Sequence, residues 1–219
     1  MYLCSISTIN HNSMLIRIHP DNPSERLLRL AVDCLRQGGV IIYPTDTVYA
    51  IGCDIHQSKA VQRVAQIKNI KPENANFSLI CHDLSHISDL TKPFSTSIYK
   101  AMKKGLPGPF TFILNANNNV PKLFQSRKKT VGIRIPDNKI SRELVRLLGN
   151  PMISTSVYDD DEIIQYTTDP ELIHENYQQH VDIVIDGGNG GNQASTVIDC
   201  TGDELVVVRE GKGRLEEIL

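Results

Sequence analysis

Residues 19–44, HPDNPSERLLRLAVDCLRQGGVIIYP, place the tightest limit on the fold. Their apolar residues recur three and four positions apart, which is typical of a helix with one buried face. Asn22 is placed to cap this helix and Gly38 to end it. Residues 40–42 are all apolar and predict a strand buried on both faces. Such a strand needs layers packed on either side of its sheet, so we expect the α/β class.

The rest of the chain alternates irregularly between the same two patterns. Helices are predicted near residues 58–68, 95–104, 138–148 and 169–177. Strands are predicted at residues 77–81, 110–114, 131–135, 152–155, 181–185, 195–199 and 205–208. The irregular order favours a twisted mixed sheet with flanking helices over a pure βαβ repeat. With 219 residues, the chain is expected to form a single domain over residues 14–219, preceded by a loose extension at residues 1–13.

Charge is distributed very unevenly along the chain. Residues 92–146 contain 12 Lys and Arg against 2 Asp and Glu, whereas residues 147–219 contain 3 against 15. A segment as basic as the first attracts phosphates and nucleic acids. Folding of the basic segment against the acidic one explains the same pattern, so the sequence leaves both interpretations open.

Several common signatures are missing from the sequence. It contains no Walker phosphate loop, no dinucleotide-binding fingerprint, no nucleophile elbow and no H-E-x-x-H zinc motif. His82 and His86 stand four residues apart without a third ligand at a recognisable spacing, so no metal site is expected. The five cysteines form no C-x-x-C pair, and no apolar run approaches the roughly 20 residues that cross a bilayer. We expect reduced thiols and a cytoplasmic protein without a membrane partner.

Short segments rich in Ser and Thr adjoin several predicted strands: PTDTVY at 44–49, STS at 154–156 and ASTV at 194–197. Each is also typical of ordinary capping at a strand end. Together with nearby cations they supply the donors that hold a phosphate or carboxylate when no phosphate loop is present. These cations are Lys68, Lys71, Arg134 and Arg209. The glycine-rich DGGNGG at 186–191 lies between two predicted strands and favours a hairpin or a tight loop.

Nine segments in order carry a resemblance to a known family. They are HPDNP at 19–23, GGVIIYPTDTVYAIGC at 38–53, FSLICHDL at 77–84, PGPFTFIL at 107–114, KKTVGIRIP at 128–136, PMISTS at 151–156, IDGGNGG at 185–191, STVID at 195–199 and VVVREGKG at 206–213. Over about 195 residues the chain resembles the YrdC/YciO family, and most closely its YciO branch. The resemblance implies a YrdC-like twisted sheet with a concave, positively charged surface.

Family members with demonstrated chemistry join L-threonine, bicarbonate and ATP into threonylcarbamoyl adenylate for tRNA modification. The resemblance therefore implies ATP as a substrate or ligand, accompanied by Mg, and no tightly bound cofactor. It places the amino-acid end at Thr45, Thr47, Tyr49 and His82. It places the nucleotide and its phosphates at Lys68, Lys71, Thr111, Arg134, Ser156, Ser195 and Arg209. Catalysis of this kind is positional and electrostatic, so no catalytic nucleophile is expected.

Two motifs depart from the pattern of the synthases. Where they carry K-x-R followed by Pro, this chain has Lys68, Asn69 and Ile70, with Lys71 one position late. Ile70 cannot replace a guanidinium, and a lysine lacks the bidentate fork of arginine. Where the synthases carry S-A-N, Ser156 is followed by Val157 and Tyr158. Losing one preorganised donor costs on the order of 3 kcal/mol, about a hundredfold in rate. The sequence thus leaves open whether the chain is an enzyme.

Two hypotheses follow. In the first, the chain holds ATP or AMP in a nucleotide pocket of the threonylcarbamoyl-adenylate type, and Arg134→Ala weakens nucleotide binding without unfolding the protein. In the second, it binds double-stranded RNA or tRNA through Arg127, Lys128 and Lys129, and the nucleotide pocket is vestigial. An aromatic content of 5% without tryptophan argues against stacking on single strands and favours backbone recognition. The sequence does not determine the oligomeric state.

Overall fold

The fold is known from a computed structural model that describes residues 13–71, 75, 77–85, 87–121, 129–157 and 168–219. Five α-helices lie within these residues: α1 (Glu25–Arg36), α2 (Ser58–Ile67), α3 (Thr96–Gly105), α4 (Lys139–Leu148) and α5 (Pro170–Tyr177). The strands are β1 (Met14–Arg17), β2 (Val40–Tyr43), β3 (Ala50–Asp54), β4 (Ser78–Ile80), β5 (Phe110–Asn115), β6 (Thr130–Arg134), β7 (Met152–Ser156), β8 (Ile183–Asp186), β9 (Thr196–Asp199) and β10 (Val206–Arg209).

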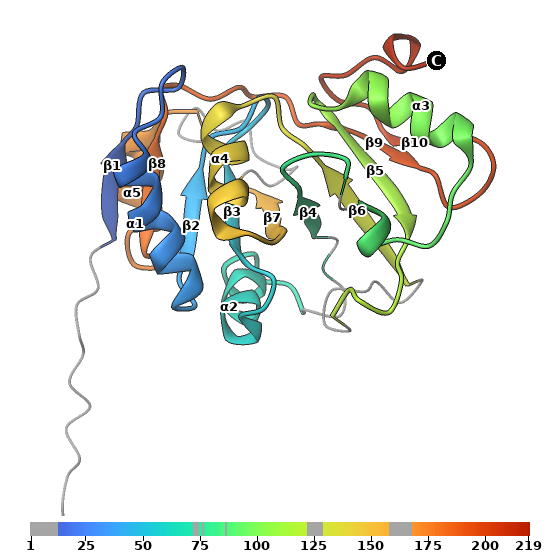
Figure 1. Cartoon of the computed structure of the whole chain (residues 1–219). Coiled ribbons are helices and arrows are strands. Elements are labelled where there is room, and N and C mark those ends of the chain that lie inside the picture. The colour runs from blue at the N-terminus through green and yellow to red at the C-terminus, as the bar shows by residue number, and fades with distance from the viewer. Residues whose placement is uncertain (1–12, 72–74, 76, 86, 122–128, 158–167) are drawn as a thin grey trace, which may run out of the picture.

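All ten strands join one mixed sheet in the order β1-β8-β2-β3-β7-β4-β6-β5-β9-β10. α1 and α4 lie side by side and share a buried cluster with one sheet face (Figure 1). α2, α3 and α5 contribute to the cluster on the other face. On β2, Ile41 belongs to the first cluster and Ile42 to the second. The predicted burial of this strand on both faces and the α/β class are confirmed.

Three details of the sequence prediction need correction. The N-cap of α1 is Ser24 and not Asn22, because the first helical turn begins at Glu25. β1 and β3 were not predicted, and the structure adds both to the sheet, β1 beside β8 and β3 between β2 and β7. The DGGNGG segment is not a hairpin, since β8 pairs with β1 and β2 whereas β9 pairs with β5 and β10.

Candidate functional site

A pocket of about 180 Å³ opens on the sheet. Its lining includes residues from seven strands that are consecutive in the sheet, from β3 to β10. At about 4.8 Å per strand, seven strands in a flat sheet would span roughly 29 Å. Residues from all seven can reach one small pocket only because the sheet curls around it. The site is therefore a product of sheet curvature.

Side-chain alternation decides which residues face the pocket. On β6, Thr130, Gly132 and Arg134 line it, whereas Val131 and Ile133 belong to the core cluster with α2, α3 and α5. β5 behaves in the same way: Thr111 and Ile113 line the pocket, and the phenylalanines on either side of Thr111 face the core. Since neighbouring side chains on a strand point to opposite faces, one face of these strands supplies the core and the other the site.

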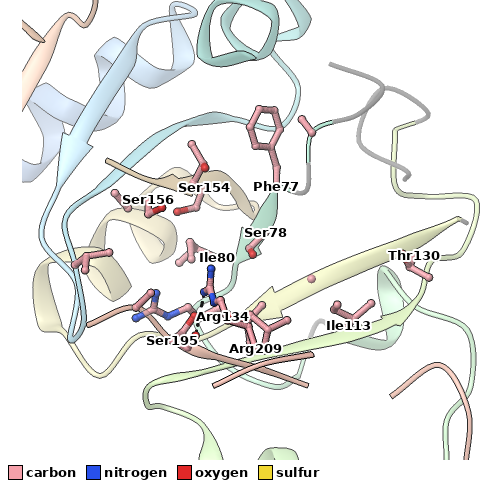
Figure 2. Close-up of a pocket in the computed structure, with 18 residues that line it drawn as sticks. Phe77, Ser78, Ile80, Ile113, Thr130, Arg134, Ser154, Ser156, Ser195 and Arg209 are labelled. Atoms are coloured by element: carbon pink, nitrogen blue, oxygen red, sulfur yellow. Dashed lines mark hydrogen bonds between the residues drawn. The ribbon is translucent and has the colours of Figure 1, made fainter. Parts of the chain in front are cut away.

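Hydroxyl and guanidinium groups dominate the polar lining. The hydroxyls belong to Ser78, Thr111, Thr130, Ser154, Thr155, Ser156 and Ser195, and the guanidiniums to Arg134 and Arg209. Figure 2 shows Ser154 and Ser156 on β7 across the pocket from Ser195 and Arg209. Among the described residues that line the pocket there is no Asp or Glu. Donors without a competing carboxylate suit an anionic ligand, such as a phosphate or a carboxylate.

Gly132 forms part of the floor of the pocket. It is the register partner of Ser78 on β4 and of Ile113 on β5. A Cβ atom at this position would lie 3.1 Å from Ser78 Oγ and 3.3 Å from Thr111 Cγ2. The missing side chain therefore leaves room above Gly132 for these two hydroxyl-bearing side chains, which come from β4 and β5 on either side of β6.

Arg134 is held from one side by the turn that follows β2. Its Nη2 donates to Asp46 Oδ1 at 2.6 Å and to Thr47 Oγ1 at 2.7 Å, with Thr45 Oγ1 at 3.4 Å. The side chains of Arg134 and Asp46 are only 10% and 9% exposed. Arg134 Nε and Asp46 Oδ2 are buried and have no partner among the described residues. One face of the guanidinium is thus fixed in an ion pair while the residue still lines the pocket.

The C-terminal segment closes the opposite wall. Arg209 is exposed at the end of β10, and its Nη2 donates to the carbonyl of Ser195 at 2.9 Å. Ser195 Oγ lies 2.9 Å from Thr111 Oγ1. Lys212 Nζ donates to the carbonyl of Asp46 at 2.6 Å. These contacts join β10 and the segment after it to β5, β9 and the turn at residues 45–47.

The structure brings together most of the residues that the sequence assigns to a nucleotide. Five line the pocket: Thr111, Arg134, Ser156, Ser195 and Arg209. Thr45 and Thr47, which the resemblance assigns to the threonine substrate, accept hydrogen bonds from the Arg134 guanidinium. No role was predicted for Asp46, although it lies inside the PTDTVY segment; its carboxylate between two hydroxyl residues was the available signal. Ser78, Thr130 and Lys212 were also missed, because they lie outside the segments with a recognised hydroxyl pattern.

Other assigned residues do not line this pocket. Lys68 is the C-cap of α2, and Lys71 is exposed in the segment that follows. Tyr49 is buried and donates to the carbonyl of Gly188 at 2.6 Å. His82 lines a second pocket beside Cys81, Leu90 and the C-terminal end of α4. Lys68 and Lys71, which were expected to contact the phosphates, therefore do not line the hydroxyl-rich pocket.

The residues assigned to RNA are only partly described. Lys129 is exposed immediately before β6 and has a positive φ of 55°. Arg127 and Lys128 lie outside the described residues, as does His86. Of the Lys and Arg in residues 92–146 that the structure describes, Arg134 alone lines the pocket. Among all the residues that the structure describes, no group of three metal-ligating side chains is found. No helix among them is long and apolar enough to span a bilayer.

A curled ten-stranded mixed sheet with a hydroxyl- and arginine-lined pocket defines the class as a YrdC-like α/β protein. The family model Sua5/YciO/YrdC, described as "Telomere recombination", matches residues 33–211. The chain therefore belongs to the Sua5/YciO/YrdC family.

Relatives of two kinds are found within this family. YciO of Escherichia coli (strain K12) is 43% identical over 210 residues, which cover 94% of this chain and 100% of that protein. Its crystal structure matches with a TM-score of 0.88 and 41% identity, again over 94% and 100% of the two chains. A threonylcarbamoyl-AMP synthase of Coxiella burnetii (strain RSA 493) is 30% identical over 168 residues, covering 77% of this chain and 89% of that one.

A solved structure links the fold to a ligand in a more distant relative. The P. abyssi Sua5 structure complexed with L-threonine matches with a TM-score of 0.85 and 27% identity. The match covers 94% of this chain and 60% of that chain. The family thus connects this chain with the threonylcarbamoyl-AMP synthases and, through them, with tRNA modification.

Proposed function

We propose that the hydroxyl- and arginine-lined pocket binds an adenine nucleotide, ATP or AMP, with its phosphate end on Arg134 and Arg209. The observation that carries the proposal is the composition of the lining, which contains two guanidiniums and many hydroxyls but no described carboxylate. Charge-assisted hydrogen bonds from such donors are the strongest contacts that a protein offers to a phosphate. The volume of about 180 Å³ is below the usual 300–1,000 Å³ of small-molecule sites, so it suits one end of a nucleotide.

The reaction that fits this site is formation of threonylcarbamoyl adenylate from ATP, L-threonine and bicarbonate, with release of pyrophosphate and water. Mg²⁺ would accompany the ATP phosphates, because the described lining offers no carboxylate to hold it. The protein would contribute position and charge stabilisation. Lys68 and Lys71 lie outside the pocket and Ile70 replaces a guanidinium, so we expect turnover at least a hundredfold below that of a synthase with the full K-x-R motif.

The first experiment measures pyrophosphate release from Mg-ATP by the purified chain, with and without threonine and bicarbonate, together with detection of threonylcarbamoyl adenylate. Isothermal titration calorimetry with ATP and AMP measures binding independently of turnover. Arg209→Gln should weaken nucleotide binding about tenfold because it removes an exposed cationic donor. Arg26→Gln on the exposed side of α1 is the matched control. A wild-type chain that binds neither nucleotide contradicts the proposal.

RNA binding is the second candidate, and a specific observation favours it. Lys100, Lys103 and Lys104 are all exposed on α3, within the segment that carries 12 Lys and Arg. Replacing Arg127, Lys128 and Lys129 together by Gln should reduce the affinity for double-stranded RNA or tRNA. The slope of log K against log salt should also fall, by about one for each phosphate that the protein no longer neutralises. An unchanged slope would exclude residues 127–129 as the RNA-binding surface.

A further inference from the structure

Tyr43 and Ser154 form a buried hydrogen bond directly behind the pocket. Tyr43 is the last residue of β2 and is fully buried, whereas Ser154 on β7 lines the pocket. The Tyr43 hydroxyl donates to Ser154 Oγ at 2.7 Å. The two strands are not neighbours, because β3 lies between them in the sheet. The tyrosine ring therefore has to reach across β3.

Gly52 on β3 makes this reach possible. It is the register partner of Ser154 on one side and of Ile41 on the other. A Cβ atom at Gly52 would lie 2.8 Å from Tyr43 Cε1 and 2.8 Å from the carbonyl oxygen of Ile153. A glycine at the centre of a strand costs stability and marks a place where another group approaches closely. Here the group that approaches is the tyrosine ring on its way to Ser154.

The direction of the hydrogen bond from Tyr43 to Ser154 determines which hydrogen-bonding group Ser154 can offer to a ligand. A serine hydroxyl has one hydrogen to donate and lone pairs that accept. Tyr43 donates to one lone pair of Ser154 Oγ, so the serine hydrogen has to point away from Tyr43, and among the described residues no acceptor is found for that hydrogen. Burial raises the pKa of Tyr43, so this phenol keeps its proton and remains a donor throughout the physiological pH range.

We propose that Tyr43 is a positioning residue that orients the Ser154 hydroxyl to donate a hydrogen bond into the pocket, to a phosphate oxygen of the nucleotide. Without the tyrosine hydroxyl, the serine rotates freely between donating and accepting. The fixed orientation reduces the loss of rotational freedom on binding, which is the benefit of preorganised donors. The inference rests on the proposed function, since it assumes an anionic ligand at this site.

The test is a double-mutant cycle on the full chain, with AMP as the probe. Tyr43→Phe, Ser154→Ala and the double variant are titrated by calorimetry, and stability is measured in parallel by thermal unfolding. Each single variant should raise the Kd for AMP about tenfold, as expected for removal of one hydrogen bond to a charged group. In the Ser154→Ala background, Tyr43→Phe should leave Kd unchanged. Ser141→Ala in α4 is the control for removal of a buried hydroxyl away from the pocket.

A spectroscopic readout separates positioning from general destabilisation. The ³¹P resonance of bound AMP should shift with the same sign in Tyr43→Phe and in Ser154→Ala, because the first weakens and the second removes the same hydrogen bond from Ser154. Unchanged AMP binding in either single variant overturns the inference and leaves the proposed function standing. An equal loss from Tyr43→Phe in the wild-type and Ser154→Ala backgrounds overturns it as well. A wild-type chain that binds neither AMP nor ATP overturns both.

Discussion

At the level of single residues, Arg134 is both part of the pocket and part of the folded core. Its guanidinium contacts the carboxylate of Asp46 at 2.6 Å, and both side chains are about nine-tenths buried. A buried charge is tolerated only with a partner, so removing one member of such a pair is more costly than removing both. We therefore expect Arg134→Ala to lower stability as well as nucleotide binding.

Arg134→Ala should lower the free energy of unfolding by about 3 kcal/mol, because it leaves the Asp46 carboxylate buried without its cation. Urea denaturation measures the change. The further loss on adding Asp46→Ala to this variant should be small, since no unpaired charge then remains. Arg209→Ala is the matched control and should change stability by less than about 0.5 kcal/mol, because that side chain is exposed. Equal stabilities of the two arginine variants would contradict the buried ion pair.

At the level of secondary-structure elements, helix caps differ in what they contribute. Asn138 caps α4, and its side chain accepts a hydrogen bond from the Ser141 N–H at 3.1 Å. Ser24 caps α1 without any side-chain hydrogen bond. Asn and Ser are both favoured residue types at an N-cap, but only the backbone geometry decides whether the side chain reaches an N–H.

Asn138→Ala should therefore lower the free energy of unfolding by about 1 kcal/mol, the usual cost of removing a cap bond. Ser24→Ala should change it by no more than a few tenths of that. Thermal unfolding of the two variants under identical conditions measures the difference. A larger effect at Ser24 would show that its hydroxyl caps α1 in solution.

The middle of β3 gives a second test at this level. Gly52→Ala should destabilise the chain by about 2 kcal/mol, because the new methyl group meets the carbonyl of Ile153, a backbone atom that cannot turn aside. Gly202→Ala is the control, since a Cβ atom there meets nothing within 4 Å. Denaturant midpoints of the two variants provide the comparison. If they shift equally, β3 does not pass as close to β7 as the structure shows.

At the level of the whole molecule, the core cluster that α2, α3 and α5 form with the sheet contains buried cysteine thiols in their neutral form. It contains Cys81 and Cys200. Burial raises the pKa of Cys81 to about 12 from an ordinary 9.0, and that of Cys200 likewise to about 12. Above pH 9 the unfolded chain releases these protons while the folded chain retains them. Because the unfolded state then binds fewer protons, the free energy of unfolding falls as the pH rises from 9 toward 12.

Urea denaturation at pH values of about 8, 9 and 10 should show this loss beginning near pH 9. Cys81→Ala should flatten the decline by up to about 1.4 kcal/mol per pH unit, the most that one proton can contribute. The variant will also be less stable at every pH, so the slope and not the absolute value is the measurement. An unchanged slope would show that Cys81 ionises equally in the folded and unfolded states.

The connection from β8 to β9 also belongs to the whole molecule. β8 lies near one end of the sheet and β9 near the other, so the glycine-rich segment between them spans the sheet (Figure 1). A Cβ atom at Gly190 would lie 2.7 Å from Tyr49 Cδ2. The glycines therefore permit a close crossing over the PTDTVY segment, where the sequence pattern had allowed a hairpin.

Local patterns in the sequence were enough to predict the class of fold, most helices and strands, and the chemical types of the donors. Helical spacing around Leu28 and the apolar run at residues 40–42 report burial within one element, and such burial is a local property. The resemblance to a known family added the assignment of Arg134 and Ser195 to one site. β1 and β3 were missed, and what places them in the sheet is pairing with distant strands, β1 with β8 and β3 with β7, which no local pattern reports.

Which of those donors meet was set by contacts between segments far apart in the chain. Strand order in the sheet does not follow chain order, so the pairing that sets β7 beside β4 and β9 beside β5 is invisible to local patterns. The same long-range packing pairs Arg134 with Asp46, directs Tyr43 to Ser154, and leaves Lys68 and Lys71 outside the pocket. The chemical type of each side chain is read directly from the sequence. The curvature that brings these side chains together in one site is a property of the whole sheet.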